Sequence, residues 1–130
     1  MRPARQVAAF VGFLRTVLGS THIHEAPAVP AGGYDLTVGT SEHGEQTPSS
    51  SLHLPKFEHL LVVFGGPTGL EPVLASDPYG KQHASPGQLF DRYVNTCFDQ
   101  GSRTIRTEEA VLISLSFLQP AVAAAAHYVA

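Results

Sequence analysis

Three stretches of glycine and small polar residues, each directly after an apolar segment, could bind a small molecule through main-chain groups. They are GTSEHG from Gly39, FGGPTGLE from Phe64 and NTCFDQGSRTIRTEE from Asn95. Because glycine has no Cβ, such a chain can bring amides and carbonyls against a planar ligand such as adenine. Each stretch alone is a weak signal, since glycine after a strand is more often part of a tight turn. Neither G-x-G-x-x-G nor G-x-x-x-x-G-K-[ST] occurs, which argues against a dinucleotide-binding fold and a P-loop.

The third stretch leads into a segment that predicts an apolar helix. Thr107 is a suitable N-cap, and the two glutamates after it place negative charge at the positive end of the helix dipole. From residue 110 to residue 118 only two serines interrupt the apolar side chains. A helix without a polar face should be buried in its own domain or against a partner. Pro120 is expected to end it, with at most a further short turn or helix in residues 122–130.

Other chemically capable residues carry less weight. His22 and His24 could suggest a metal site, but an H-x-H without a matched second pair is mostly incidental, so no metal is expected. Cys97 could act as a nucleophile only beside a base, and a small residue next to a ligand is the simpler interpretation.

The elements that must position these stretches alternate along the chain. Three strands are expected, at residues 34–38, at residues 59–64 and around Tyr93 and Val94. The second is apolar throughout, as in a strand buried on both faces. Loops are expected at residues 40–56 and 75–88, and a short helix at residues 68–74. This order predicts an α/β fold with ligand-binding loops at the carboxyl ends of its strands.

Composition and charge narrow the function classes. The chain has 130 residues, 43% hydrophobic and 15% charged, which suits one small domain with a weakly charged surface. The net charge of -3 argues against nonspecific nucleic-acid binding, so any RNA contact must be local. A single cysteine excludes an internal disulfide framework and favours an intracellular location, nuclear or cytoplasmic. No apolar run approaches the length of a membrane span, so no membrane partner is expected.

The first nineteen residues form a separate question. They contain three arginines and no acidic residue, and their apolar residues recur at helical spacing. One interpretation is a domain helix packed on a sheet; the other is an organellar targeting segment. The wide apolar stripe favours the domain helix.

The segments GGYDLTVGTSEHG, HLLVVFGGPTGLE and YVNTCFDQGSRTIRTEEAVLISL, in this order and spacing, resemble the C-terminal part of the SPOUT-class RNA methyltransferases, specifically the SPOUT domain-containing methyltransferase 1 group. The resemblance runs from residue 32 to residue 119. It implies a mostly parallel sheet with a C-terminal deep trefoil knot, an exception to the rule that chains do not thread loops. It also implies bound S-adenosylmethionine and a homodimer. Residues 1–31 then form a helix and connector and residues 32–130 the knot region, with the N-terminal half of longer relatives missing.

Carried over by residue, the resemblance implies that three knot loops hold the cofactor. The residues expected to bind it are Thr40, Ser41, His43, Phe64, Gly65, Gly66, Leu70, Asn95, Thr96, Cys97, Gln100, Gly101, Ser102, Thr104 and Ile105. His43 stands where the commoner form of the motif has arginine, so a contact that needs a fixed cation is absent there.

The reaction implied by the resemblance is methyl transfer from a sulfonium to a base of rRNA or tRNA, with a uridine ring nitrogen as the expected acceptor. Arg103 and Arg106 are candidates for contacting RNA phosphate or the developing negative charge. Alternatively, one of them forms a structural ion pair with a neighbouring acidic residue. Glu71 is expected to serve as a loop or helix-start residue rather than a base. A non-catalytic remnant that keeps the knot to bind the cofactor or a protein partner is the alternative function.

Overall fold

A three-stranded parallel sheet lies at the centre of the computed structural model, which describes residues 34–65, 70–72 and 86–126. Its strands are β1 (Leu36–Glu45), β2 (Leu60–Phe64) and β3 (Arg92–Val94), in the order β2-β1-β3. The predicted α/β fold with a parallel sheet is therefore confirmed. Since all three strands run the same way, their carboxyl ends meet at one edge of the sheet.

The middle strand, β1, is the buried one. Residues 36–40 are all buried, whereas β2 buries only Val63, because β2 forms one edge of the described sheet. The expectation that residues 59–64 are buried on both faces is thus wrong for most of that strand. β1 and β2 pair in register from Leu36 with Leu60 onward, and Asp35 accepts hydrogen bonds from the Glu58 and His59 amides at 2.8 and 2.7 Å.

The first glycine-containing stretch was expected to be a loop. It is instead a bulge within β1. Thr40 and Glu45 both pair with Val94 of β3, so residues 41–44 are extra on the β1 side. The Asn95 amide donates to the Glu45 carbonyl at 2.9 Å and closes the bulge. A Cβ on Gly44 would lie 2.4 Å from the Val94 carbonyl carbon, so only glycine allows this approach.

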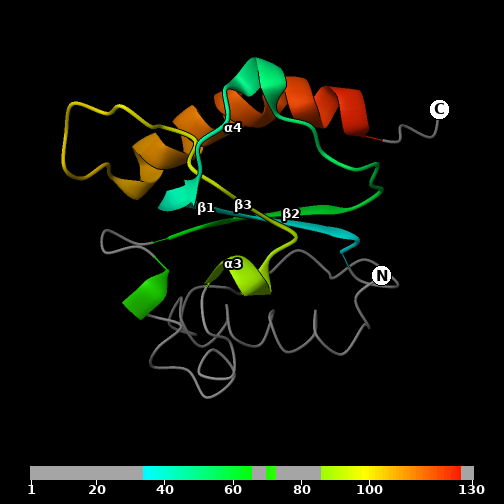
Figure 1. Ribbon diagram of the computed structural model, residues 1–130, viewed down its shortest axis with the longest axis horizontal. Coiled ribbons are helices and arrows are strands. Elements are labelled where there is room, and N and C mark those ends of the chain that lie inside the picture. Colours follow the sequence, from blue (N-terminus) through cyan, green and yellow to red (C-terminus); the bar gives the residue numbers. More distant parts are fainter. Residues whose placement is uncertain (1–33, 66–69, 73–85, 127–130) are drawn as a thin grey trace.

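Helices cover the sheet on two sides (Figure 1). α4 (Thr107–Ala125) and the short 3-10 helix η1 (Ser49–Ser51) lie over one face, and α3 (Pro86–Leu89) lies on the other. Part of the expected loop at residues 75–88 is therefore helical. The expected helix at residues 1–19, the connector that follows it, His22 and His24 lie outside the described residues, as does most of the segment 68–74.

Two expectations about the ends of α4 are wrong. Arg106, not Thr107, is the N-cap, and the Glu109 carboxylate accepts its amide at 3.2 Å. Pro120 lies inside the helix, which continues to Ala125. Proline leaves the Ser116 carbonyl without its usual partner, but Ser116 is exposed and water can hydrate it. Burial of Ala121 and Ala125, both strong helix formers, favours continuation past the proline.

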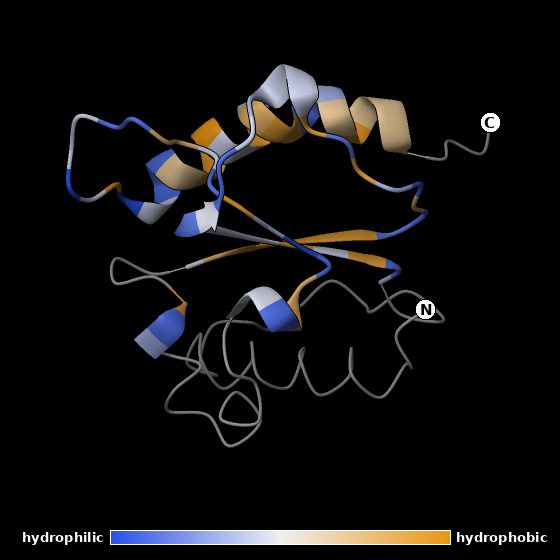
Figure 2. Ribbon diagram, in the orientation of Figure 1, coloured by the Kyte–Doolittle hydropathy of each residue, from blue (hydrophilic) through white to orange (hydrophobic). Residues whose placement is uncertain are grey.

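The main core lies between the sheet and α4. Figure 2 shows apolar residues on the strands and along α4, the layers that face each other. The buried cluster consists of Leu36, Val38, Leu52, Phe57, Val94, Leu118, Ala121 and Ala125. Phe57 and Ala126 also form an isolated parallel bridge, which fixes the end of α4 beside the segment before β2.

Only one stripe of α4 is buried, although its sequence predicted burial all round. Leu112 and Leu115 are 73% and 51% exposed. The helix is also long and apolar enough to cross a membrane by length and composition alone, which corrects the expectation that no apolar run approaches that length. A single such helix is weak evidence of a membrane span, and here Leu118 and its neighbours pack into the core of a mixed domain.

Candidate active site

A cleft of about 180 Å³ opens where the carboxyl ends of the three strands meet the start of α4. We call it the main cleft. Its lining residues come from the β1 bulge, the end of β2, residue 71, the segment after β3 and the first turns of α4. They are Thr40, Ser41, Glu42, Phe64, Gly65, Glu71, Asn95, Thr96, Cys97, Gln100, Arg103, Thr104, Ile105, Ala110, Ile113 and Ser114.

Most residues predicted to bind the cofactor meet in this cleft. They are Thr40, Ser41, Phe64, Gly65, Asn95, Thr96, Cys97, Gln100, Thr104 and Ile105, and the catalytic candidate Arg103 is with them. All three sequence stretches contribute. The cleft therefore unites residues up to 74 positions apart in the sequence, from Thr40 to Ser114, as expected at one edge of a parallel sheet.

The remaining predicted residues do not line the main cleft. Leu70 is 3% exposed and belongs to the core, and Gly101 has no atom within 4 Å of a Cβ built on it. Ser102 instead donates from its hydroxyl to the Thr104 carbonyl at 2.6 Å. His43 lies beside Glu71, 3.5 Å from its carboxylate, and Arg106 caps α4. Gly66 lies outside the described residues.

Sequence reasoning missed four lining residues, Glu71, Ala110, Ile113 and Ser114, whereas Glu42 belongs to the first of the expected knot loops. Glu71 was assigned a purely local role. Ser114 did leave a signal, because a serine inside an apolar helix needs a polar partner when it is buried. That partner is Thr96, whose hydroxyl oxygen lies 2.6 Å from that of Ser114. The pair fixes the segment after β3 to α4 at the floor of the cleft.

Hydrogen bonds within the segment after β3 hold its shape. Asn95 donates from its side-chain amide to the Glu42 carbonyl at 3.0 Å and accepts from the Cys97 amide at 3.1 Å. Gln100 donates from its side chain to the Ser102 carbonyl at 2.6 Å. Asp99 adopts φ 61°, the left-handed conformation that aspartate tolerates better than most residues. The side chains that face the cleft therefore project from a backbone whose conformation these hydrogen bonds fix.

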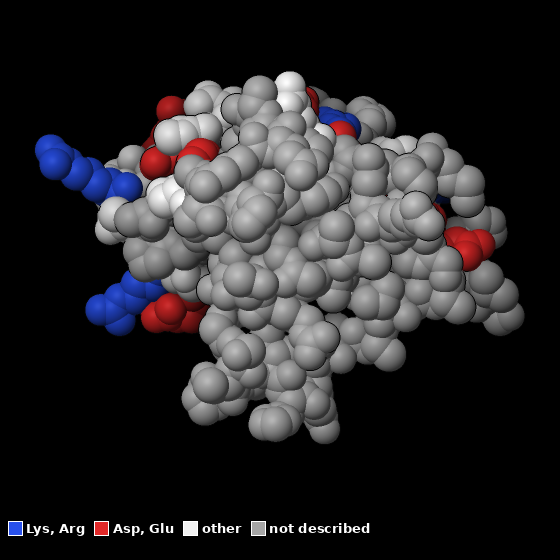
Figure 3. Space-filling view, turned by 90° about the horizontal axis from the view of Figure 1, so that it is seen from below, with Lys and Arg blue, Asp and Glu red and all other residues white. Residues whose placement is uncertain are grey.

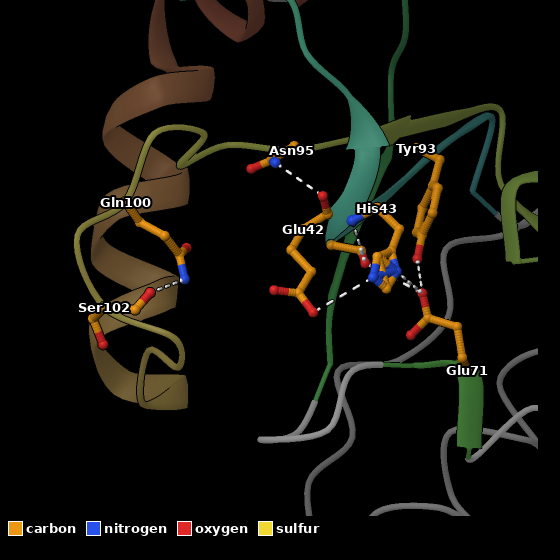
Figure 4. A network of polar contacts seen from close by, with 8 residues as sticks. Glu42, His43, Glu71, Tyr93, Asn95, Gln100 and Ser102 are labelled. Carbon is orange, nitrogen blue, oxygen red and sulfur yellow. Dashed lines mark hydrogen bonds and ion pairs between the residues drawn. The ribbon is translucent and has the colours of Figure 1, made fainter.

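An acidic group forms one side of the cleft (Figure 4). The Glu71 carboxylate accepts hydrogen bonds from Tyr93 at 2.9 Å and Ser41 at 3.4 Å, and the His43 ring lies 3.5 Å from it. Glu42 lies 3.5 Å from the other nitrogen of His43. Gln100 and Ser102, beside α4, are on the opposite side.

The network decides the charge of Glu71. Burial on its own would raise the pKa of this carboxyl, but hydrogen bonds from its own amide, Tyr93 and Ser41 and the nearby His43 together lower its pKa below 4.5. Glu71 is therefore an anion at neutral pH and a weak base. Burial, with the neighbouring Glu71 carboxylate, raises the pKa of Tyr93 to about 12, so its phenol remains a donor.

Comparison with known proteins assigns a family to this arrangement. Residues 12–118 match the model of a family described as "Putative RNA methyltransferase". The chain belongs to this RNA methyltransferase family. It is 61% identical over 88 residues, 68% of the chain, to proteins of Mus musculus and Homo sapiens named 28S rRNA (uridine-N(3))-methyltransferase. It is 43% identical over 117 residues, 90% of the chain, to the Drosophila melanogaster protein of that name.

This RNA methyltransferase family member spans about a quarter of the length of these relatives: 22% of the mouse, 23% of the human and 24% of the fly protein. Residues 12–118, which match the family model, nevertheless include every residue that lines the main cleft.

The two arginine candidates of this RNA methyltransferase domain differ in their surroundings. Arg106 lies 3.9 Å from Glu108, so the expected structural ion pair is present there. Arg103 lines the main cleft and pairs with no acidic residue in the part of the chain that the structure describes. In Figure 3, seen from the side opposite α4, the described arginine and lysine side chains that are visible lie at the edges of the view. Arg103 is thus the stronger candidate for a functional cation.

Proposed function

We propose that this domain transfers a methyl group from S-adenosylmethionine to a ring nitrogen of uridine in ribosomal RNA. The observation that carries the proposal is the main cleft, where the stretches after all three strands meet. The names of the mouse, human and fly relatives supply the acceptor and the RNA class. S-adenosylmethionine supplies an activated methyl group, so the protein mainly has to align the acceptor and stabilise its negative charge.

The lining fits this methyl donor in polarity and charge. Ile105 and Ile113 offer apolar surface for a purine ring, and the polar groups of Asn95 and Thr96 lie close by. Glu71 is an anion on one side, which suits a ligand that carries a sulfonium and an ammonium group. Arg103 would stabilise the negative charge that develops on the acceptor base or contact RNA phosphate.

Two further features belong to the same proposal. The strand order β2-β1-β3 with a following helix is consistent with the SPOUT class and its trefoil knot. Leu112 and Leu115 present an exposed apolar strip on α4, which supports a homodimer through this helix.

The test uses the full chain of 130 residues. Calorimetric titration with S-adenosylmethionine should show binding, and transfer of a labelled methyl group to ribosomal RNA should follow, with the product identified by nucleoside mass spectrometry. Arg103→Ala should lower methyl transfer at least tenfold with little change in donor affinity, while the matched variant Arg106→Ala should retain activity. A folded protein that binds no S-adenosylmethionine contradicts the proposal; binding without transfer supports the non-catalytic alternative.

A further inference from the structure

A second hollow adjoins the main cleft. We call it the side hollow; it has a volume of about 360 Å³ and is more open to solvent. Five residues line both spaces: Glu42, Asn95, Cys97, Gln100 and Arg103. The two spaces therefore adjoin along the segment after β3.

Hydrogen bonds hold the residues that line both spaces in place. The Asn95 side chain joins the Glu42 carbonyl and the Cys97 amide at 3.0 and 3.1 Å, and Gln100 donates to the Ser102 carbonyl at 2.6 Å. Fixed side chains that border both spaces can set the distance and direction between two ligands that meet where the spaces adjoin. Alignment of two reactants is the main contribution that a methyl transfer needs from protein.

The side hollow has the chemistry of a nucleobase site. The residues that line it but not the main cleft are Gln46, Phe98, Asp99 and Ser102. The Gln46 amide offers an N–H donor for a carbonyl oxygen of uracil, and a hydrogen bond to that oxygen leaves the neighbouring ring nitrogen free to accept a methyl group. Phe98 adds aromatic surface and is held by an edge-to-face contact with Phe117, with ring centroids 6.4 Å apart. Arg103 places a cation at the boundary, where a phosphate would follow the base.

We propose that the side hollow binds the acceptor base of a single-stranded RNA segment, with Gln46 donating a hydrogen bond to a carbonyl oxygen of the base and Phe98 contacting its ring. The inference rests on the proposed function, because it assigns the main cleft to the methyl donor. It adds the location of the acceptor and names a specificity residue, Gln46, that lies outside the three glycine-containing stretches.

The experiment separates this inference from the proposed function by measuring RNA contact directly. A short oligoribonucleotide with one 4-thiouridine is photocrosslinked to the full chain and the crosslinked peptide is mapped by mass spectrometry. We expect the crosslink within residues 42–46 or 95–103, the two segments that line the side hollow. Gln46→Ala should weaken oligonucleotide binding roughly tenfold, the loss expected for one hydrogen bond that then leaves the base unpaired, while S-adenosylmethionine affinity stays within about twofold.

Gln119→Ala is the matched control, since Gln119 is an exposed glutamine on α4 that lines neither space. A crosslink outside residues 42–46 and 95–103, or equal RNA affinity of Gln46→Ala and Gln119→Ala, overturns the inference and leaves the donor assignment intact. If the wild-type chain binds no S-adenosylmethionine, by contrast, the proposed function on which the inference depends is rejected.

Discussion

The hydroxyl groups of Thr96 and Ser114 lie 2.6 Å apart in the core, at 9% and 2% exposure. They come from the segment after β3 and from α4, eighteen positions apart. Both residues also line the main cleft, so one buried hydrogen bond connects the stability of the domain with the shape of its candidate site.

Breaking this pair on one side should be costly. Thr96→Val leaves the Ser114 hydroxyl buried without its partner, and we expect the free energy of unfolding to fall by about 1–3 kcal/mol. The double variant Thr96→Val with Ser114→Ala removes both polar groups and should recover part of that loss. Urea unfolding of the wild type, the two single variants and the double variant measures the coupling; strictly additive losses would contradict it.

The bulge in β1 depends on Gly44. Gly44→Ala should lower the free energy of unfolding by more than 1 kcal/mol, because the new Cβ would lie 2.4 Å from backbone of β3, which cannot move without breaking the sheet. Gly101→Ala is the matched control, since nothing lies within 4 Å of its Cβ, and should change stability by less than about 0.5 kcal/mol. Similar thermal midpoints for the two variants would argue against the bulge.

Glu71 should make folding depend on pH in the acid range. Its pKa in the folded domain lies below its ordinary value of 4.5, so the ionised carboxylate stabilises the fold above that pH. This contribution should disappear as the pH falls below 4.5 through the lowered pKa. Urea unfolding of the wild type and Glu71→Gln from pH 3 to pH 7 tests the sign: the difference between them should be larger at pH 7. A difference that grows toward acid pH is incompatible with a lowered pKa.

Tyr93 should ionise only at strongly alkaline pH. Its pKa is raised to about 12, and its hydroxyl donates to Glu71 at 2.9 Å. Ultraviolet absorption of tyrosinate, followed with rising pH, should therefore show a late component that Tyr93→Phe removes. Because the raised pKa favours the protonated phenol, its stabilising contribution should be complete below pH 10 and lost as the pH rises through about 12. A spectrum in which Tyr93→Phe removes an early component would contradict the arrangement.

The exposed strip on α4 should govern association rather than folding. Leu115→Glu places a charge on a side chain that is 51% exposed, so a monomer should remain folded while the proposed homodimer dissociates. Sedimentation velocity, together with circular dichroism, separates these effects. Gln119→Glu adds the same charge to an exposed position on the same helix and should leave the dimer unchanged. Unfolding of Leu115→Glu would mean that the helix face belongs to the core.

Local patterns predicted the main elements of the described part of the protein, its three strands and α4. The continuous apolar run at residues 60–64 and the apolar segment from residue 110 have few alternatives to strand and helix, and Gly44 marks a place where two backbones approach closely. The parallel sheet was predicted from such local signals and from the family resemblance. The same reasoning predicted fifteen cofactor-binding residues, and ten of them line the main cleft.

Tertiary structure alone decided what depends on distant partners. The sequence could not show that residues 41–44 form a bulge, because a bulge is defined by the second strand, β3, that pairs on either side of it. It could not show that Glu71 is a fixed anion, since its pKa depends on Tyr93 and Ser41 from other strands. The path of α4 through Pro120 likewise follows from the burial of Ala121 and Ala125, which outweighs a local helix-breaking signal. Elements follow from short-range sequence, whereas charge, register and the shape of the site follow from what the fold brings together.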